Sequence, residues 1–186
     1  MTKVILGVTI SLDGFAEDGK GSVGPLYPDL DMLRNTEVLR ESIQTTGAVV
    51  MAWKEFAMAE NPDYYAGNYE YQVPIFVFTD KAPKKHPKET DKLTFTFVTD
   101  GIKSAVRQAK VSAGDKNVTI IGSASTVQQF LQNKLADELH VEVIPIFLRV
   151  GSRPFDDIGA VSIRLERINV VELPAGRTQL RFRIIK

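Results

Sequence analysis

Residues 118–125 read VTIIGSAS, a run of β-forming residues followed at once by four small ones. The run predicts a buried strand, and the small residues predict a tight turn into a helix. Such a turn leaves backbone N–H groups at the helix start, where they can bind a phosphate or another anion. The alternative is a plain strand-to-helix connection, in which Ser123 or Ser125 caps the helix. The rest of the chain shows which fold this strand belongs to.

Apolar runs with strand-like composition recur on both sides of this stretch. We expect strands at Val4–Ile10, Ala48–Met51, Ile75–Phe78, Thr94–Val98, Val118–Ile121, Leu139–Phe147, Val161–Leu173 and Thr178–Ile185. Helical spacing of apolar residues predicts helices at Leu30–Ile43, Ile102–Val111 and Thr126–Lys134. Ala57–Gln72 and Lys81–Lys92 are expected to be irregular. Strands that alternate with helices predict a three-layer α/β sandwich around a mixed, mostly parallel central sheet. The turn signal at Pro174–Arg177 predicts a C-terminal antiparallel hairpin.

Composition argues against several classes of protein. The 186 residues include 23 basic and 23 acidic ones, so the zero net charge argues against nucleic acid or an anionic membrane as main partner. There is no cysteine and there are two histidines, His86 and His140, so thiol catalysis and a zinc site are not expected. No apolar run approaches the ~18 residues of a membrane helix. We expect one cytoplasmic domain over residues 1–186, without a signal peptide.

Ligands of such sheets bind beyond the carboxyl ends of the parallel strands. The segments that follow predicted strands are therefore the first candidates for a site. They are Ser11–Phe15, Ala52–Phe56, Thr79–Lys81 and Gly122–Thr126.

Five segments match the motifs of a known family in order and spacing. Ser11–Phe15 is similar to an S-x-D-G-hydrophobic motif after the first strand, and Pro74–Thr79 to a third strand ending in Thr or Ser. Val118–Ser125 stands where the family has a strand and a Gly-Gly turn. Leu135–Leu139 is similar to its D-E-L strand, and Pro145–Phe155 to its P-x-x-x-G-x-G-x-x-x-F turn. Over nearly its whole length, the chain thus resembles the dihydrofolate reductase superfamily, specifically the C-terminal reductase domain of the bacterial riboflavin-biosynthesis enzyme.

The resemblance implies hydride transfer from NADPH to a C=N or C=O bond of a small heterocyclic or carbonyl substrate. The positions that it implies for cofactor binding are Ala52, Trp53, Lys54, Thr79, Lys81, Gly122, Ser123, Ala124, Ser125 and Thr126. It implies substrate binding by Asp13 and Phe15. Lys81 suits the 2′-phosphate of NADPH, whereas Asp80 suits the free 2′-OH of NADH, and both cofactors stay open. It also implies a homodimer, for which the hairpin Val161–Ile185 offers a sheet edge.

Three aspartates are candidates for assisting proton delivery to the substrate. Asp29 and Asp31 open the first long helix, where dihydrofolate reductases place a carboxylate that faces the pterin ring. Such a group works best when burial raises its pKa toward the working pH. Asp13 lies in the loop after the first strand. The alternatives are an N-cap role for Asp29, a helix-dipole role for Asp31 and an ordinary turn role for Asp13.

The sequence departs from the family pattern where that pattern meets the cofactor. The second strand ends Ala52-Trp53-Lys54-Glu55 in place of G-R-x-T, and the Glu55 carboxylate is expected to oppose a phosphate dianion unless Lys54 offsets its charge. Ser123 replaces the second glycine of the Gly-Gly turn, and Arg149 replaces the first glycine of the late turn. A non-catalytic, dimeric ligand-binding protein with an eroded cofactor site is therefore the rival prediction. Flavin or deazaflavin binding has no positive support in the residues.

Overall fold

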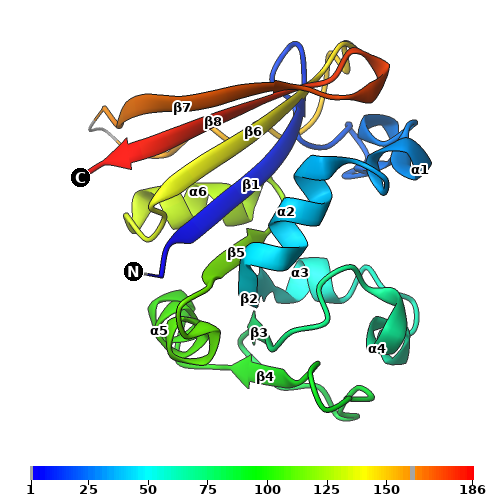
Figure 1. Cartoon of the computed structure of the whole chain (residues 1–186), viewed down its shortest axis with the longest axis vertical. Coiled ribbons are helices and arrows are strands. Elements are labelled where there is room, and N and C mark those ends of the chain that lie inside the picture. The colour runs from blue at the N-terminus through cyan, green and yellow to red at the C-terminus, as the bar shows by residue number, and fades with distance from the viewer. Residues whose placement is uncertain (1, 160–161) are drawn as a thin grey trace. The chain divides into compact units, whose positions relative to one another are not determined.

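The computed structural model describes residues 2–159 and 162–186, which form helices and strands in alternation (Figure 1). The chain divides into two compact units. Unit 1 comprises Met1–Val4 and Ser42–Ile121, and unit 2 comprises Ile5–Glu41 and Gly122–Lys186.

Unit 1 is built on parallel strands in the order β4-β3-β2-β5. In that order they span Phe95–Val98, Ile75–Phe78, Thr46–Ala52 and Asn117–Ile121. Most of β2 is buried, as is typical of a parallel strand that is covered on both faces. The amphipathic helix α5 (Ile102–Ala113) packs against this sheet through its small side chains Ala105 and Ala109, which are fully buried.

A cluster of aromatic rings completes the core of unit 1. Phe56 stacks on Tyr65 at a centroid distance of 5.6 Å and meets the edge of Phe97 at 5.3 Å. The short helical elements near the cluster are α3 (Trp53–Phe56), η2 (Pro62–Tyr64) and α4 (Tyr65–Asn68). Ala57–Gln72, predicted to be irregular, therefore contains two helical turns. The rings stabilise these turns because each buries a large apolar area.

Unit 2 holds its strands in the order β1-β6-β8-β7. In that order they span Val4–Ser11, Glu138–Ile144, Thr178–Ile185 and Arg164–Glu172. β1 pairs with β6 in parallel, whereas β6–β8 and β8–β7 are antiparallel. The remaining elements are η1 (Gly24–Leu26), α1 (Leu30–Leu33), α2 (Glu37–Thr45), α6 (Ala124–Gln132) and η3 (Pro174–Gly176); α2 crosses the unit boundary after Glu41. The predicted α/β class, the mostly parallel sheet and the C-terminal hairpin are confirmed.

The helix predicted over Leu30–Ile43 is two helices in the structure. α1 and α2 are separated at Arg34–Thr36. The side chain of Thr36 explains the break, because its Oγ1 accepts a hydrogen bond from the N–H of Leu39 at 3.3 Å and so caps α2. The single long helix was therefore a wrong prediction.

Two strand ends also differ from the prediction by three residues, more than any other strand end. β6 ends at Ile144 rather than at Phe147, because Pro145 has no N–H to donate to a neighbouring strand. The start that was predicted for the seventh strand, at Val161, lies outside the described residues, and β7 begins at Arg164.

Candidate functional site

The turn after β5 forms as the sequence predicts. Gly122 is required there, because a Cβ would lie 2.3 Å from Cγ2 of Thr126. Ser123 occupies the N-cap position of α6, and its Oγ lies 3.2 Å from that of Ser125. Helix geometry leaves the N–H groups of Ala124 and Ser125 without an intrahelical acceptor. This nine-residue helix can therefore receive an anion at its start.

The exposure of the α6 residues divides them by role. Ser123, Ala124 and Thr126 are buried, and Ser125 is exposed. Buried side chains fix the turn, so a ligand at this end of α6 would meet backbone N–H groups and the hydroxyl of Ser125. Ser123, which replaces the second glycine of the family's turn, is therefore buried rather than exposed at the surface.

In unit 1, the predicted cofactor residues follow the ends of two neighbouring strands. Ala52, the last residue of β2, pairs with Phe78, the last residue of β3, and Thr79 comes next in the chain. The Thr79 hydroxyl donates to the carbonyl of Lys81 at 3.0 Å and accepts from its N–H at 3.3 Å. These bonds close a turn that leaves Lys81 exposed.

Trp53 and Lys54 begin the short helix α3. The Trp53 ring packs on Phe56 and Phe97 at centroid distances of 5.3 and 6.3 Å, yet 38% of the residue is exposed. Lys54 is exposed beside it. The Trp53 ring is therefore held by packing on two phenylalanines, while part of it stays accessible to solvent.

Glu55 is turned toward its own backbone. Its Oε2 accepts a hydrogen bond from the N–H of Ala52 at 3.1 Å, and the residue is 9% exposed. The carboxylate therefore takes an N–H that lies where the resemblance places a cofactor contact. A phosphate at Ala52 would have to compete with this carboxylate.

In unit 2, Asp13 is engaged in a network of hydrogen bonds. Its Oδ1 accepts from the Ser11 hydroxyl at 2.6 Å and from the N–H of Leu148 at 3.1 Å, and its Oδ2 accepts from the N–H of Arg149 at 2.8 Å. These bonds outweigh burial, which is the largest single influence, and lower the pKa of Asp13. Asp13 therefore ties the turn after β1 to the turn after β6.

That second turn shows why the family favours glycine there. Arg149, at the position of the first family glycine, has a φ of +68°. Gly151, at the position of the second, has a φ of +142°, and a Cβ there would lie 1.8 Å from the carbonyl oxygen of Glu17. Arg149 is tolerated because the left-handed region is open to an L-residue at a modest cost, which the bond to Asp13 offsets.

Phe15 follows Asp13 and is buried under a cation. The guanidinium carbon of Arg153 lies 4.1 Å from the centroid of the Phe15 ring. The carbonyl of Arg153 in turn accepts a hydrogen bond from the side chain of Gln128 on α6 at 2.9 Å. A substrate that contacts Phe15 would therefore meet Arg153 as well.

Asp29 is buried and bound by Arg177. Nη2 of Arg177 donates to Oδ1 of Asp29 at 2.6 Å, and Nε donates to Oδ2 at 3.2 Å. This hydrogen bonding lowers the pKa of Asp29 despite its burial. Asp29 has the N-cap position of α1, but its side chain caps nothing there.

Asp31 lies on the exposed side of α1. Its Oδ1 pairs with Nη1 of Arg34 at 3.2 Å, one turn further along. The Asp31 side chain is 95% exposed, which fits the role of an acidic residue in the first turn of a helix. The assignment of a proton-delivery role to Asp13, Asp29 or Asp31 stays a prediction. The pKa values of Asp13 and Asp29 are lowered rather than raised, and Asp31 is not buried.

Sequence reasoning missed two residues that join Asp29 in a buried cluster. Arg177 is 1% exposed, and its Nη1 donates to Oε2 of Glu142 at 3.4 Å. Burial raises the pKa of Glu142. Arg177 is the last residue of a turn signal, and Glu142 lies among alternating polar residues of a strand. Both patterns predict exposed side chains, and neither indicates that the two side chains form a buried pair.

The predicted cofactor residues are divided between the two units. Those from Ala52 to Lys81 belong to unit 1, and Gly122–Thr126 belong to unit 2, together with the predicted substrate residues. Among the described residues, no group of three or more metal-ligating side chains gathers in one place. Nor does this part of the chain contain a helix long and apolar enough to cross a membrane.

The strand order, the turn after β5 and the turn at Asp13 are those of an α/β fold of the dihydrofolate reductase type. The model of the RibD C-terminal domain family matches residues 2–177. The chain therefore belongs to the RibD C-terminal domain family.

Solved structures agree with this assignment of the fold. A putative riboflavin biosynthesis protein from Shewanella sp. PV-4 has a TM-score of 0.76 at 20% identity, with all of both chains covered. The deaminase/5-amino-6-(5-phosphoribosylamino)uracil reductase of Thermotoga maritima has a TM-score of 0.67 at 15% identity, and the match covers 99% of this chain and 57% of that one. Dihydrofolate reductase from Enterococcus faecalis, solved with NADP(H), has a TM-score of 0.65 at 11% identity, with 99% and 97% covered.

Proposed function

We propose that this protein is a reductase that transfers a hydride from NADPH to a small heterocyclic or carbonyl substrate, with NADH as the alternative cofactor. The observation that carries this proposal is the match to the RibD C-terminal domain family over residues 2–177. When bound, the nicotinamide cofactor supplies the hydride, so the protein needs only to bind, orient and exclude water.

The start of α6 supports cofactor binding by this chain. The N–H groups of Ala124 and Ser125 and the exposed hydroxyl of Ser125 suit a phosphate group. We assign Gly122 and the residues 123–126 to this contact. In unit 1, Thr79 and Lys81 offer a hydroxyl and an exposed ammonium group that suit a phosphate or a ribose.

We assign positioning roles to Asp13 and Asp29 within the substrate half of the site. Both have lowered pKa values, so both are ionised at neutral pH. An ionised carboxylate cannot donate a proton, but it can hold a neighbouring group in place. Asp13 holds the turn at Leu148 and Arg149, and Asp29 holds Arg177.

Cofactor titration tests the proposal. Trp53 is the only tryptophan of the chain and is partly exposed, so NADPH bound near it should change its fluorescence. Calorimetry provides a readout that does not depend on Trp53. If neither method detects NADPH or NADH up to about millimolar concentrations, which corresponds to about −4 kcal/mol, the reductase proposal fails.

A pair of charge variants localises the phosphate. Ser125→Asp places a carboxylate at the start of α6 and should weaken NADPH binding, while the helix itself is not destabilised by an acidic residue there. Gln129→Glu adds the same charge one turn further along on an exposed position. If the two variants weaken binding equally, the phosphate does not bind at the start of α6.

The second candidate function is a non-catalytic, dimeric ligand-binding protein on the same fold. The bond from the Ala52 N–H to Glu55 supports it, because the carboxylate takes a group that a phosphate would use. Glu55→Thr should tighten NADPH binding if this competition matters. If the Glu55→Thr variant binds NADPH with unchanged or weaker affinity, Glu55 does not oppose the phosphate. The hydrogen bond at Ala52 then no longer supports the second candidate function.

A further inference from the structure

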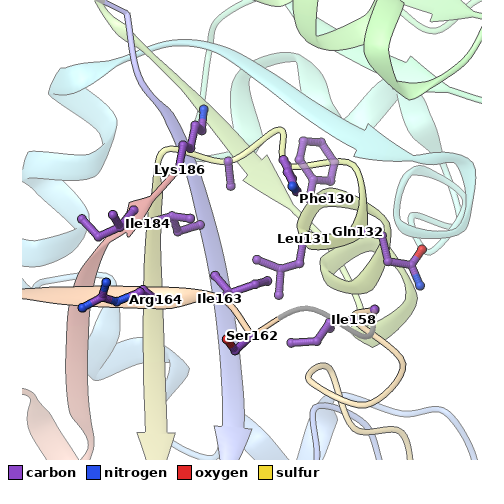
Figure 2. Close-up of a pocket in the computed structure, with 13 residues that line it drawn as sticks. Phe130, Leu131, Gln132, Ile158, Ser162, Ile163, Arg164, Ile184 and Lys186 are labelled. Carbon is purple, nitrogen blue, oxygen red and sulfur yellow. The ribbon is translucent and has the colours of Figure 1, made fainter.

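A pocket of about 660 Å³ opens in unit 2 at the far end of α6 from the predicted phosphate contact (Figure 2). Its described walls come from the last turn of α6 and the chain just after it, from residues 158–159 and 162–164, and from the end of β8. We call it the α6–β8 pocket. α6 has nine residues, so its two ends lie about 13 Å apart. The pocket is therefore a separate place from the turn at Gly122.

The interior of the α6–β8 pocket is apolar. Leu131 of α6 and Ile163 point toward one another in Figure 2, and Ile158 lies beside them. Phe130 and Ala136 are buried in the wall, whereas the polar Gln132 points away. Ligand pockets of soluble proteins are typically of this size and this apolar character, with a small number of polar groups for orientation.

The charged side chains that line the described part of the pocket all have the same sign. Lys134, Arg164 and Lys186 line it, and none of the described lining residues is acidic. Lys186 pairs with Asp137 at 2.6 Å, but within the described chain neither Lys134 nor Arg164 has a carboxylate within ion-pair distance. Two cations at the edge of an apolar cavity are complementary to a ligand that carries a negative charge.

The nearby end of α6 does not cancel this positive charge. The last carbonyls of a helix normally present a partial negative charge. Here the carbonyls of Gln129, Phe130 and Leu131 accept the N–H groups of Asn133, Leu135 and Lys134 at 3.0–3.1 Å. Because three of the last four carbonyls of α6 are already occupied, the partial negative charge at this end of the helix is reduced, and we expect the cationic side chains to dominate the electrostatics at the mouth of the pocket.

We propose that the α6–β8 pocket binds a small amphipathic carboxylate, with its apolar body between Leu131 and Ile163 and its carboxylate at Lys134 and Arg164. The site is distinct from the one in the proposed function, and its occupation does not require the reductase activity. A ligand with an apolar chain and a single negative charge satisfies both the cavity and its cations.

Isothermal titration of the full chain with three ten-carbon probes tests this proposal. Decanoate, decanol and decylammonium have similar apolar bodies and differ in charge. We expect saturable binding of one decanoate per chain, weaker binding of decanol and the weakest binding of decylammonium. Excess NADPH should leave the binding of decanoate unchanged, since the two sites lie at opposite ends of α6.

Two matched variants locate the charge contact. Arg164→Gln should weaken decanoate binding about three- to fivefold at low salt, the range expected for an exposed ion pair, and leave decanol binding unchanged. Arg167→Gln removes an exposed arginine from the same strand outside the pocket and should leave both unchanged. Both changes are on the surface, so neither should prevent folding.

A third variant tests the cavity itself. Ile158→Trp places a larger side chain in the pocket from a half-buried position and should reduce the binding of decanoate and decanol alike. The proposal is overturned if no saturable binding of decanoate occurs, if decanol binds as tightly as decanoate, or if NADPH displaces decanoate.

Discussion

Asp29 shows how one partner reverses the chemistry that burial alone would give a carboxyl group. Burial without a partner raises a carboxyl pKa, and that shift is what a proton donor needs. Arg177 donates two hydrogen bonds to Asp29 and one to the carbonyl of Leu26 at 2.7 Å, so the ionised form is favoured. The cluster thereby fixes the segment before α1 to the hairpin turn.

Breaking the Asp29–Arg177 pair should therefore cost stability. Asp29→Asn leaves the buried guanidinium without its main counter-charge, and loss of one partner of a buried pair costs about 3 kcal/mol or more. We expect the free energy of unfolding in urea at pH 7 to fall by about that amount. Asp31→Asn, on the exposed side of the same helix, is the control and should change it by less than about 0.5 kcal/mol. Equal losses would show that Arg177 does not depend on Asp29.

The same pair should make stability depend on pH. Since the folded pKa of Asp29 lies below its ordinary value of 3.8, its ionised form contributes stability that is present above about pH 4. That contribution is lost as the pH falls through the lowered pKa. We expect the difference in unfolding free energy between wild type and Asp29→Asn to shrink as urea titrations move from pH 7 to below pH 4. A difference that does not change over this range would contradict the prediction.

Asp13 should control the local dynamics of the turn that it binds. Removing its carboxylate in Asp13→Ala frees the N–H groups of Leu148 and Arg149. We expect these two amides to exchange hydrogen faster, as measured by NMR. Asp18→Ala removes a comparable turn carboxylate, which accepts from Lys20 and Ser22, and should leave Leu148 and Arg149 unaffected. Unchanged exchange at both amides in Asp13→Ala would exclude this holding role.

At the scale of the elements, apolar periodicity predicts strands better than it predicts helix ends. The predicted bounds of β3 and β8 are those observed, because apolar runs between turn signals leave few alternatives. The prediction of one long N-terminal helix was wrong, because the helical spacing of apolar residues continues across Thr36. In the structure the hydroxyl of Thr36 accepts a local hydrogen bond, and a new helix begins there. Local side-chain bonds of this kind leave no trace in the periodicity.

The parts of the candidate site that are built from backbone groups could be predicted from the sequence. The turn at Gly122 and the tight approach at Gly151 follow from glycine in a strand-turn pattern. The partners of the carboxylates were not predictable, since Asp29 and Arg177 are 148 positions apart and meet through the tertiary fold. The hydrogen bond from the Ala52 N–H to Glu55 was not predictable either, because it depends on the side-chain rotamer of Glu55.

The edge strand β7 should mediate self-association. Leu165, Ile168 and Val170 are each more than 40% exposed on this strand, and an exposed apolar edge strand favours pairing with a second chain. We expect a homodimer in sedimentation equilibrium at micromolar concentrations. Ile168→Lys places a charge on the edge and should yield monomers, whereas Val111→Lys, at an exposed apolar position on α5, should not. A monomeric wild-type protein would refute this prediction.

At the scale of the whole molecule, the two compact units are interleaved along the chain. Unit 1 includes Met1–Val4, and the chain then passes into unit 2 at Ile5, within β1. Inside unit 1, the carbonyl of Lys3 accepts a hydrogen bond from the N–H of Val118 at 2.8 Å. β1 and α2 each cross a unit boundary. Neither unit is therefore one continuous segment, and a strand or helix shared between units couples their folding because its hydrogen bonds form cooperatively.

This sharing of elements leads us to expect one cooperative unfolding transition, as the prediction of a single domain requires. Trp53 reports on unit 1, and Phe147→Trp in a Trp53→Phe background places a single tryptophan at an exposed position in unit 2. Urea unfolding monitored by each tryptophan and by far-UV circular dichroism should give the same midpoint for a given variant, since two-state unfolding is independent of the probe. If fluorescence and dichroism separate within either variant, the units unfold independently and the single-domain prediction is wrong.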